Sequence, residues 1–244
     1  MAPRKPKHIA EFGDFQTPDI LAQKVTDLIK RLGVSPRSII EPSCGRGAFL
    51  ASAATAFPDA MLFGLDVNDA YLQAAQAKLS HHDNLTLCHN SFFSYDWKSL
   101  LERTPHPILV LGNPPWVTNA ELGAIGSKNL PEKSNFQNMK GFEAVTGKSN
   151  FDISEWMLLQ NISWLQTGSG AIAVLCKTGV ARKVLSASWK RDIKLADARI
   201  YRIDALGDFG AAVDACLLFI QIDGVKSVKN CKIYKSTDEA DPES

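Results

Sequence analysis

The sequence predicts an α/β fold with a doubly wound, mostly parallel sheet. Apolar runs of about four to eight residues, typical of buried strands, alternate with longer amphipathic stretches typical of helices. The clearest run, Ile108–Gly112, stops at two prolines that cannot continue a sheet ladder. With 244 residues, 45% of them hydrophobic, the chain is long enough to form one large domain.

The first half of the chain alternates strands and helices. Residues 1–12 are predicted to form a flexible arm, and residues 13–236 the folded domain. A helix is expected over 18–32, with Thr17 as its N-cap and Pro18 in its first position. Three strands are expected at 38–41, 61–66 and 85–89, with helices from Ala48 and over 69–79 between them.

The second half continues this alternation after a long polar stretch. Residues 117–150 are rich in Gly, Asn, Ser and Lys and are expected to form a long insertion loop. Helices are then predicted over 151–165 and 182–190, and strands over 171–176, 198–205, 215–222 and around Ile233. The acidic end, 237–244, is predicted to be disordered.

Composition excludes some classes of protein and leaves others open. No apolar run reaches the length of about 18 residues that a membrane span needs. The five cysteines form no C-x-x-C pair, which favours reduced thiols in a cytoplasmic protein, and no metal site is predicted. The net charge is only +1, but residues 128–202 contain 12 Lys and Arg against 6 Asp and Glu. Such a surface suits a polyanion, although solvated helix faces explain it equally well.

The residues Asn113-Pro114-Pro115-Trp116 form a stiff loop at the end of a predicted buried strand. Open α/β sheets place their ligands at this end of the strands. The Asn113 amide oxygen and the Pro114 carbonyl are two acceptors that suit a planar NH2 group, and Trp116 offers a flat face for a ring. The alternative is an ordinary strand exit with an asparagine turn.

A second loop, Glu41-Pro42-Ser43-Cys44-Gly45-Arg46-Gly47, joins a predicted strand to a predicted helix. Its glycines allow the backbone a tight turn and a close approach to a ligand. Asp66 ends the next strand, where a carboxylate can bind both hydroxyls of a ribose. These features fit NAD nearly as well as S-adenosylmethionine. However, Leu50 replaces the third glycine of the dinucleotide motif, and Glu41 suits a cationic ligand, so S-adenosylmethionine is favoured.

Taken together, these motifs resemble those of the gamma-class amino-methyltransferases of bacterial restriction–modification systems, in the same order across residues 12–222. The segment 13–18, with Thr17, resembles the element that holds the methionine end of the cofactor. The 41–47 loop and Asp66 resemble the family's cofactor site, and 113–116 matches its [DN]-P-P-[YFW] signature. Asp152-Ile153 resembles the element that follows, and Phe209 the aromatic that packs on a flipped base.

The resemblance implies a class I S-adenosylmethionine-dependent methyltransferase fold, with seven strands and an antiparallel last strand. It implies methyl transfer to the exocyclic amine of adenine in DNA, with the base flipped out of the duplex and held between Trp116 and Phe209. Two departures stand out. The family's Asp-Phe pair after the third strand reads Ser91-Phe92 here, and too few residues follow the last long strand for a target-recognition domain. A missing domain, a partner or the 117–150 loop would then supply recognition.

Two other functions remain open at this point. The same chemistry occurs on other planar amides and amines, such as a protein glutamine or an RNA guanine. A catalytically silent, cofactor-binding subunit is the third possibility.

Overall fold

The computed structural model describes residues 15–118 and 152–243. The predicted arm (1–12) and nearly all of the predicted insertion (117–150) therefore lie outside the described residues. Strands, in chain order, are β1 (Ser38–Glu41), β2 (Met61–Asp66), β3 (Leu85–His89), β4 (Ile108–Gly112), β5 (Gly170–Lys177), β6 (Asp197–Ile203), β7 (Ala215–Ile222) and β8 (Lys232–Tyr234). Helices are α2 (Asp19–Arg31), α3 (Ala48–Ala56), α4 (Asp69–Lys78), α5 (Trp97–Leu101), α9 (Ile153–Leu165), α10 (Thr178–Lys190) and α11 (Ala205–Phe209).

The strands form one sheet in the order β3-β2-β1-β4-β5-β7-β6-β8. Strands β1 to β5 are parallel, whereas β7 runs antiparallel between β5 and β6. This is the class I methyltransferase arrangement implied by the resemblance, and the fold prediction is confirmed. The short β8 adds an eighth strand at the edge, parallel to β6.

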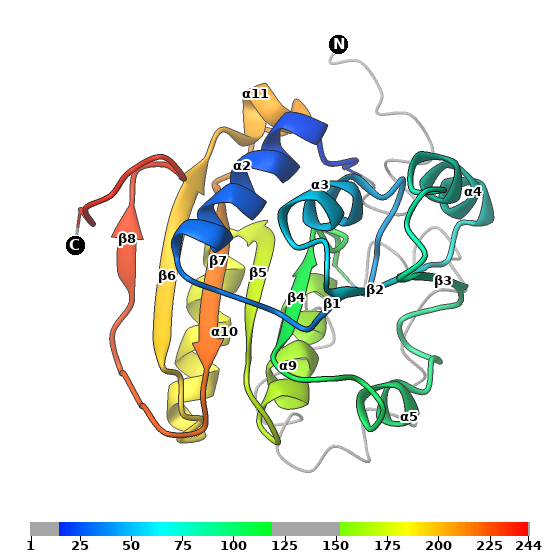
Figure 1. Ribbon diagram of the computed structural model, residues 1–244. Helices are drawn as coiled ribbons and strands as arrows, with labels where there is room; N and C mark the ends of the chain where they lie inside the picture. The colour runs from blue at the N-terminus through cyan, green and yellow to red at the C-terminus, as the bar shows by residue number, and fades with distance from the viewer. Residues whose placement is uncertain (1–14, 119–151, 244) are drawn as a thin grey trace.

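Helices cover both faces of the sheet (Figure 1). One core lies under α2, α3 and α4, and the other under α9 and α10. The central strands β1, β4 and β5 are buried along nearly their whole length, as their apolar sequences predict. From β1 the sheet grows through β2 to β3 on one side, and then from β4 to β5 on the other side. The strand order therefore reverses between β1 and β4. This is the switch point at which doubly wound sheets bind ligands.

Several predicted boundaries were wrong. The N-cap of α2 is Pro18, not Thr17, and it makes no side-chain capping bond. Helix α10 begins at Thr178, four residues before the predicted start, because it follows β5 directly with Lys177 as its N-cap. The short helices α5 and α11 were not predicted, and Phe209 lies at the end of α11.

The C-terminal segment also differs from the predicted disordered tail. The structure describes it as far as Glu243, whose carboxylate pairs with Arg202 and Lys235. Arg31 of α2 donates a hydrogen bond to the carbonyl of the buried Thr237. These contacts connect the acidic segment to α2, to β6 and to Lys235. None of the helices in the described ranges is long and apolar enough to cross a membrane.

Candidate functional site

A pocket opens at the carboxyl ends of β1, β2 and β4, at the predicted switch point. It encloses about 960 Å³ of space, including solvent at its mouth. The predicted site residues that line it are Thr17, Glu41, Ser43, Gly45, Asp66, Phe92, Asn113 and Pro115. The predicted residues outside its lining are Gly47, Ser91, Pro114, Trp116 and Phe209.

The two glycines of the 41–47 loop act in different ways. Both have positive φ, +50° at Gly45 and +75° at Gly47. A Cβ on Gly45 would lie 2.8 Å from the end of the flexible Gln16 side chain, so the positive φ is the stronger reason for a glycine at this position. A Cβ on Gly47 would lie 2.9 Å from the Ala75 Cβ. Gly47 therefore permits the turn into α3 and its packing against α4, and does not line the pocket.

Asp66 organises the loops around it. Its Oδ2 accepts a 2.7 Å hydrogen bond from the Gly45 N–H, and its Oδ1 accepts a 2.8 Å bond from the Asn68 N–H. Asn68 in turn caps α4 with its side chain. A carboxylate oxygen has further acceptor capacity beyond one such bond. Asp66 thus connects the 41–47 loop to the start of α4, and it lines the pocket.

Glu41 is a buried acid at the base of the pocket. Glu41 is only 3% exposed, and its Oε2 has no hydrogen-bond partner among the described residues. Burial raises the pKa of Glu41 well above its usual value, against a hydrogen bond from the Leu50 backbone that lowers it, and nearby Asp66 raises it further. A buried carboxyl group with one unpartnered oxygen, beside a second carboxylate, fits a positively charged ligand.

Replacing Glu41 by glutamine should therefore stabilise the protein without cofactor and weaken cofactor binding. A raised folded-state pKa means that the ionised carboxylate destabilises the fold at neutral pH. The variant should have a higher free energy of unfolding at neutral pH, and the gain should vanish at low pH, where Glu41 is protonated in both the folded and the unfolded state. For the parent protein, affinity for a cationic cofactor should fall as the pH falls through the raised pKa, because a proton competes with the ligand.

Denaturant unfolding and calorimetric binding, each measured across pH, test this expectation. The exposed Glu102, replaced by glutamine in the same way, serves as the control. Equal cofactor affinity and equal pH dependence in the Glu41→Gln variant would contradict the role given to Glu41.

Asn113 points into the pocket with a fixed amide orientation. Its Nδ2 donates a 2.8 Å hydrogen bond to the Phe15 carbonyl, which can only accept. Its Oδ1 is buried and has no partner in the structure. The role of this oxygen as an acceptor from an NH2 group stays a prediction. Pro115, two residues further on, also lines the pocket.

The predicted sandwich between Trp116 and Phe209 does not match the structure. The two rings touch each other directly, edge to face, with centroids 5.3 Å apart, so no base fits between them. Trp116 is only 5% exposed, and the Phe15 ring lies on it at 5.4 Å. The Trp116 Nε1 donates a hydrogen bond to the Leu175 carbonyl. Residues 15 and 116 meet only in three dimensions, which is why the sequence suggested an open tryptophan face.

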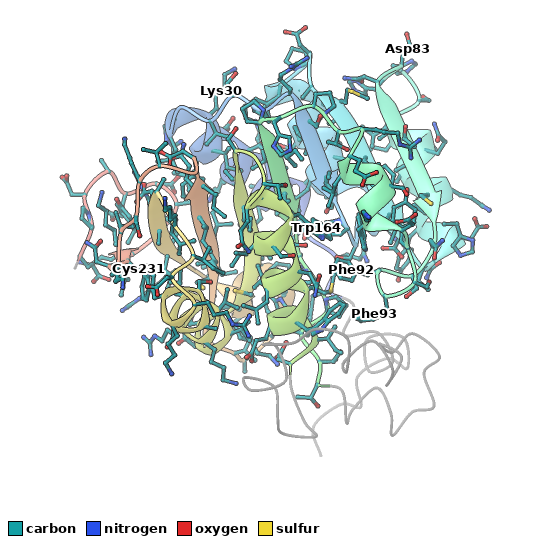
Figure 2. All side chains as sticks on the ribbon, turned by 90° about the horizontal axis from the view of Figure 1, so that it is seen from below. Lys30, Asp83, Phe92, Phe93, Trp164 and Cys231 are labelled. Carbon is teal, nitrogen blue, oxygen red and sulfur yellow. The ribbon has the colours of Figure 1, made fainter. Side chains whose placement is uncertain are left out.

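Phe92 lines the pocket, whereas Ser91 lies outside the lining. Phe92 belongs to an aromatic cluster with Phe93, on which Trp156 and Trp164 of α9 also pack. Figure 2 shows Phe92, Phe93 and Trp164 close together beside α9. The Ser91 hydroxyl instead accepts a hydrogen bond from the Phe93 N–H and closes the turn after β3.

Sequence reasoning missed several residues of the pocket wall. The ones not singled out as site residues include Val67, Asn68, Tyr71, Phe93 and Met157. The position of Asn68 and Tyr71, just after a strand that ends in an acid, is a signal that could have found them. Met157 enters the pocket from α9, one turn after Ile153, and no local pattern indicates this.

The chain is similar to known DNA methyltransferases. Residues 5–196 match the family model described as N-6 DNA Methylase. The chain belongs to this family. It is also 42% identical over 227 residues to the Type II methyltransferase M.NspV of Nostoc sp., a match that covers 92% of the chain and 47% of that relative. The chain therefore spans about half the length of the curated relative it matches.

Solved structures support the fold. A Listeria monocytogenes protein assigned to the class I S-adenosylmethionine-dependent methyltransferases matches 92% of the chain and 67% of its own chain, with a TM-score of 0.66 and 16% identity. The M protein of the Type I restriction enzyme EcoKI matches 91% and 48%, with a TM-score of 0.62 and 16% identity. Fold and family imply S-adenosylmethionine as the cofactor. The unpartnered Glu41 carboxylate oxygen and the close-fitting glycine loop agree with this cationic, nucleoside-containing group.

Proposed function

We propose that this chain is the catalytic part of an enzyme that transfers a methyl group from S-adenosylmethionine to the exocyclic amine of adenine in DNA. Membership of the N-6 DNA methylase family supports this reaction. The observation that carries the proposal is the buried Oδ1 of Asn113, which has no hydrogen-bond partner among the described residues, on a residue that lines the pocket and whose amide is held by the Phe15 carbonyl.

For this reaction the protein needs mainly to orient the amine and the methyl donor and to form hydrogen bonds to the amine. The nitrogen of an aryl amine is a weak nucleophile because its lone pair is delocalised into the ring. Asn113 Oδ1 and the Pro114 carbonyl would accept hydrogen bonds from the two amine hydrogens and stabilise the positive charge that develops. S-adenosylmethionine supplies a methyl carbon activated by its sulfonium. The N–C bond forms as the S–C bond breaks, and the amine then loses a proton to solvent.

The base would have to leave the duplex and displace one aromatic contact. An adenine stacked in DNA cannot bring its amine into a pocket, so we propose that it is flipped out. Phe15 now covers the Trp116 ring, and we propose that the Phe15 side chain moves aside when the base enters. Trp116 would then face the base, with Phe209 edge-on to the tryptophan.

Target recognition is proposed to involve a further domain or a separate subunit. The chain covers 47% of its Type II relative, so residues equivalent to the other half of that protein are not part of this sequence. The described strands all belong to one sheet. DNA is the proposed partner, and its sequence preference is left to the experiment.

The test is a transfer assay with the full chain and isotope-labelled S-adenosylmethionine. Unmethylated genomic DNA, total RNA and a protein extract serve as acceptors, and mass spectrometry of the digested products identifies the methylated atom. N6-methyladenine in DNA is the expected product. Label in a protein glutamine or an RNA guanine would replace the proposed substrate, and cofactor binding without transfer to any acceptor would indicate a silent subunit.

A further inference from the structure

The exit of the 113–118 loop is closed by contacts that no part of the proposed reaction uses. Thr118 forms an isolated antiparallel bridge with Asp152, and the Ile153 N–H donates a 2.9 Å hydrogen bond to the Val117 carbonyl. Residues 117–118 and 152–153 are therefore paired with each other directly after Trp116. Whatever holds Asp152 also holds the end of the loop that contains Asn113.

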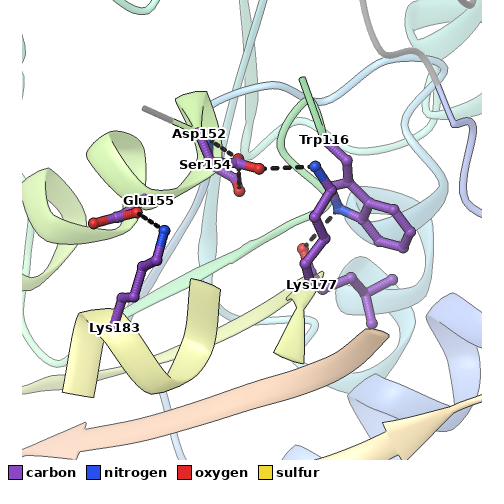
Figure 3. A network of polar contacts seen from close by, with 7 residues as sticks. Trp116, Asp152, Ser154, Glu155, Lys177 and Lys183 are labelled. Atoms are coloured by element: carbon purple, nitrogen blue, oxygen red, sulfur yellow. Dashed lines mark hydrogen bonds and ion pairs between the residues drawn. The ribbon is translucent and has the colours of Figure 1, made fainter. Parts of the chain in front are cut away.

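Asp152 is held by a helix cap and by an ion pair. Its carboxylate caps α9 by accepting hydrogen bonds from the Ser154 backbone and hydroxyl, and it pairs with Lys177 Nζ at 2.9 Å (Figure 3). The Asp152 side chain is 9% exposed and that of Lys177 is 30% exposed. An ion pair this sheltered is screened much less by solvent than one on the surface, so its loss leaves a buried charge without a counter-ion.

These contacts form a closed ring. Leu175 accepts the hydrogen bond from the Trp116 ring, and Lys177 follows two residues later on the same strand, β5. The path then runs through the ion pair to Asp152, through the bridge to Thr118 and back along the chain to Trp116. Strand β5 therefore contacts both the Trp116 side chain and, through Asp152, the exit of the 113–118 loop. Two side-chain contacts to β5 close this path, the Trp116–Leu175 hydrogen bond and the Lys177–Asp152 ion pair.

We propose that Lys177 is a positioning residue: through Asp152 it holds the 113–118 loop in the geometry that aims Asn113 and Pro114 at the acceptor amine. The proposal rests on the function proposed above. A protein whose 113–118 loop is released at its exit would still bind the cofactor, because Glu41, Asp66 and Gly45 lie on other elements. It would present the two acceptors to the amine less accurately, and a displacement of about 1 Å can lower a rate by a factor on the order of 100.

The same two helices provide a matched control. Lys183 of α10 pairs with the buried Glu155 of α9 at 3.4 Å, and its own side chain is 64% exposed. Figure 3 shows both lysine–carboxylate pairs, and only the Lys177 pair joins the residue that bridges the loop exit. Lys183→Met therefore removes a comparable ion pair between α9 and the β5–α10 segment without releasing the loop.

The experiment compares Lys177→Met, Lys177→Arg, Asp152→Asn and Lys183→Met in the full chain. Lys177→Met and Asp152→Asn should lower kcat with DNA on the order of tenfold or more relative to Lys183→Met, with cofactor affinity within about twofold of the parent protein. Lys177→Arg should recover most of the lost rate because it keeps the charge. Hydrogen exchange at the Ile153 amide should be faster in Lys177→Met than in Lys183→Met.

Two outcomes would overturn the proposal. One is equal kcat in Lys177→Met and Lys183→Met, and the other is unchanged exchange at the Ile153 amide when Lys177 is replaced. If the parent protein methylates no acceptor, the proposed function fails by itself. The exchange comparison still decides whether Lys177 holds the loop, because that measurement does not depend on activity.

Discussion

The variant Asn113→Ala is expected to lose methyl-transfer turnover by a factor on the order of 100 or more. The substitution removes the oxygen that accepts from the acceptor amine, and also the bond from Nδ2 to the Phe15 carbonyl. Cofactor binding should change little, because Asp66, Glu41 and the glycine loop lie on β1, β2 and the turns after them. The loss should therefore appear in kcat and not in the dissociation constant of the cofactor.

Single-turnover kinetics with excess enzyme, together with calorimetry, separate these two effects. Asn84→Ala is a suitable control, because the Asn84 side chain also donates to backbone carbonyls but lies outside the pocket lining. Turnover in Asn113→Ala that stays within about threefold of the parent enzyme would show that another group holds the amine.

The variant Asp66→Ala should act on cofactor binding first. Two backbone N–H groups, those of Gly45 and Asn68, lose a charged acceptor, and the pocket loses the carboxylate that we propose binds the ribose. Hydrogen bonds to charged groups contribute roughly 1.5–3 kcal/mol each, so the dissociation constant should rise by about 100-fold. At saturating cofactor, turnover should fall far less than in Asn113→Ala, because the loop after β4 is untouched.

Equilibrium binding of cofactor and of its demethylated product measures this change. The matched control is Asp69→Ala, which removes an exposed carboxylate from the first turn of α4 and its contact with Gln73. An unchanged dissociation constant in Asp66→Ala would remove Asp66 from the cofactor site and leave it only a role in shaping the loop.

The sequence was sufficient to predict the elements that carry the pocket. Strands β1, β2 and β4 were predicted from short apolar runs, and each is followed by a residue pattern that breaks the strand at the sheet edge. Because parallel strands end at the same edge, Glu41, Asp66 and Asn113 could be placed near one another without any structure. The side chains of all three line one pocket.

The contacts that depend on distant parts of the chain could not be predicted in the same way. Phe15 and Asn113 are 98 positions apart, and nothing local to either indicates that one holds the other. The burial of Trp116 follows from Phe15 and Phe209 packing on it, which reversed the expectation of an open stacking surface. Likewise, the early start of α10 follows from β5 running directly into it, and Thr178-Gly179 gives no helical signal in isolation.

The unpartnered Oε2 of Glu41 should also affect how readily the spent cofactor is exchanged for a fresh one. Methyl donation converts the sulfonium into a neutral thioether, so the spent molecule carries one positive charge fewer than the fresh donor. A site with Glu41 and Asp66 in a sheltered environment should therefore prefer the donor over the product and favour exchange of one for the other. In Glu41→Gln this preference should narrow, and the product should become a relatively stronger competitive inhibitor.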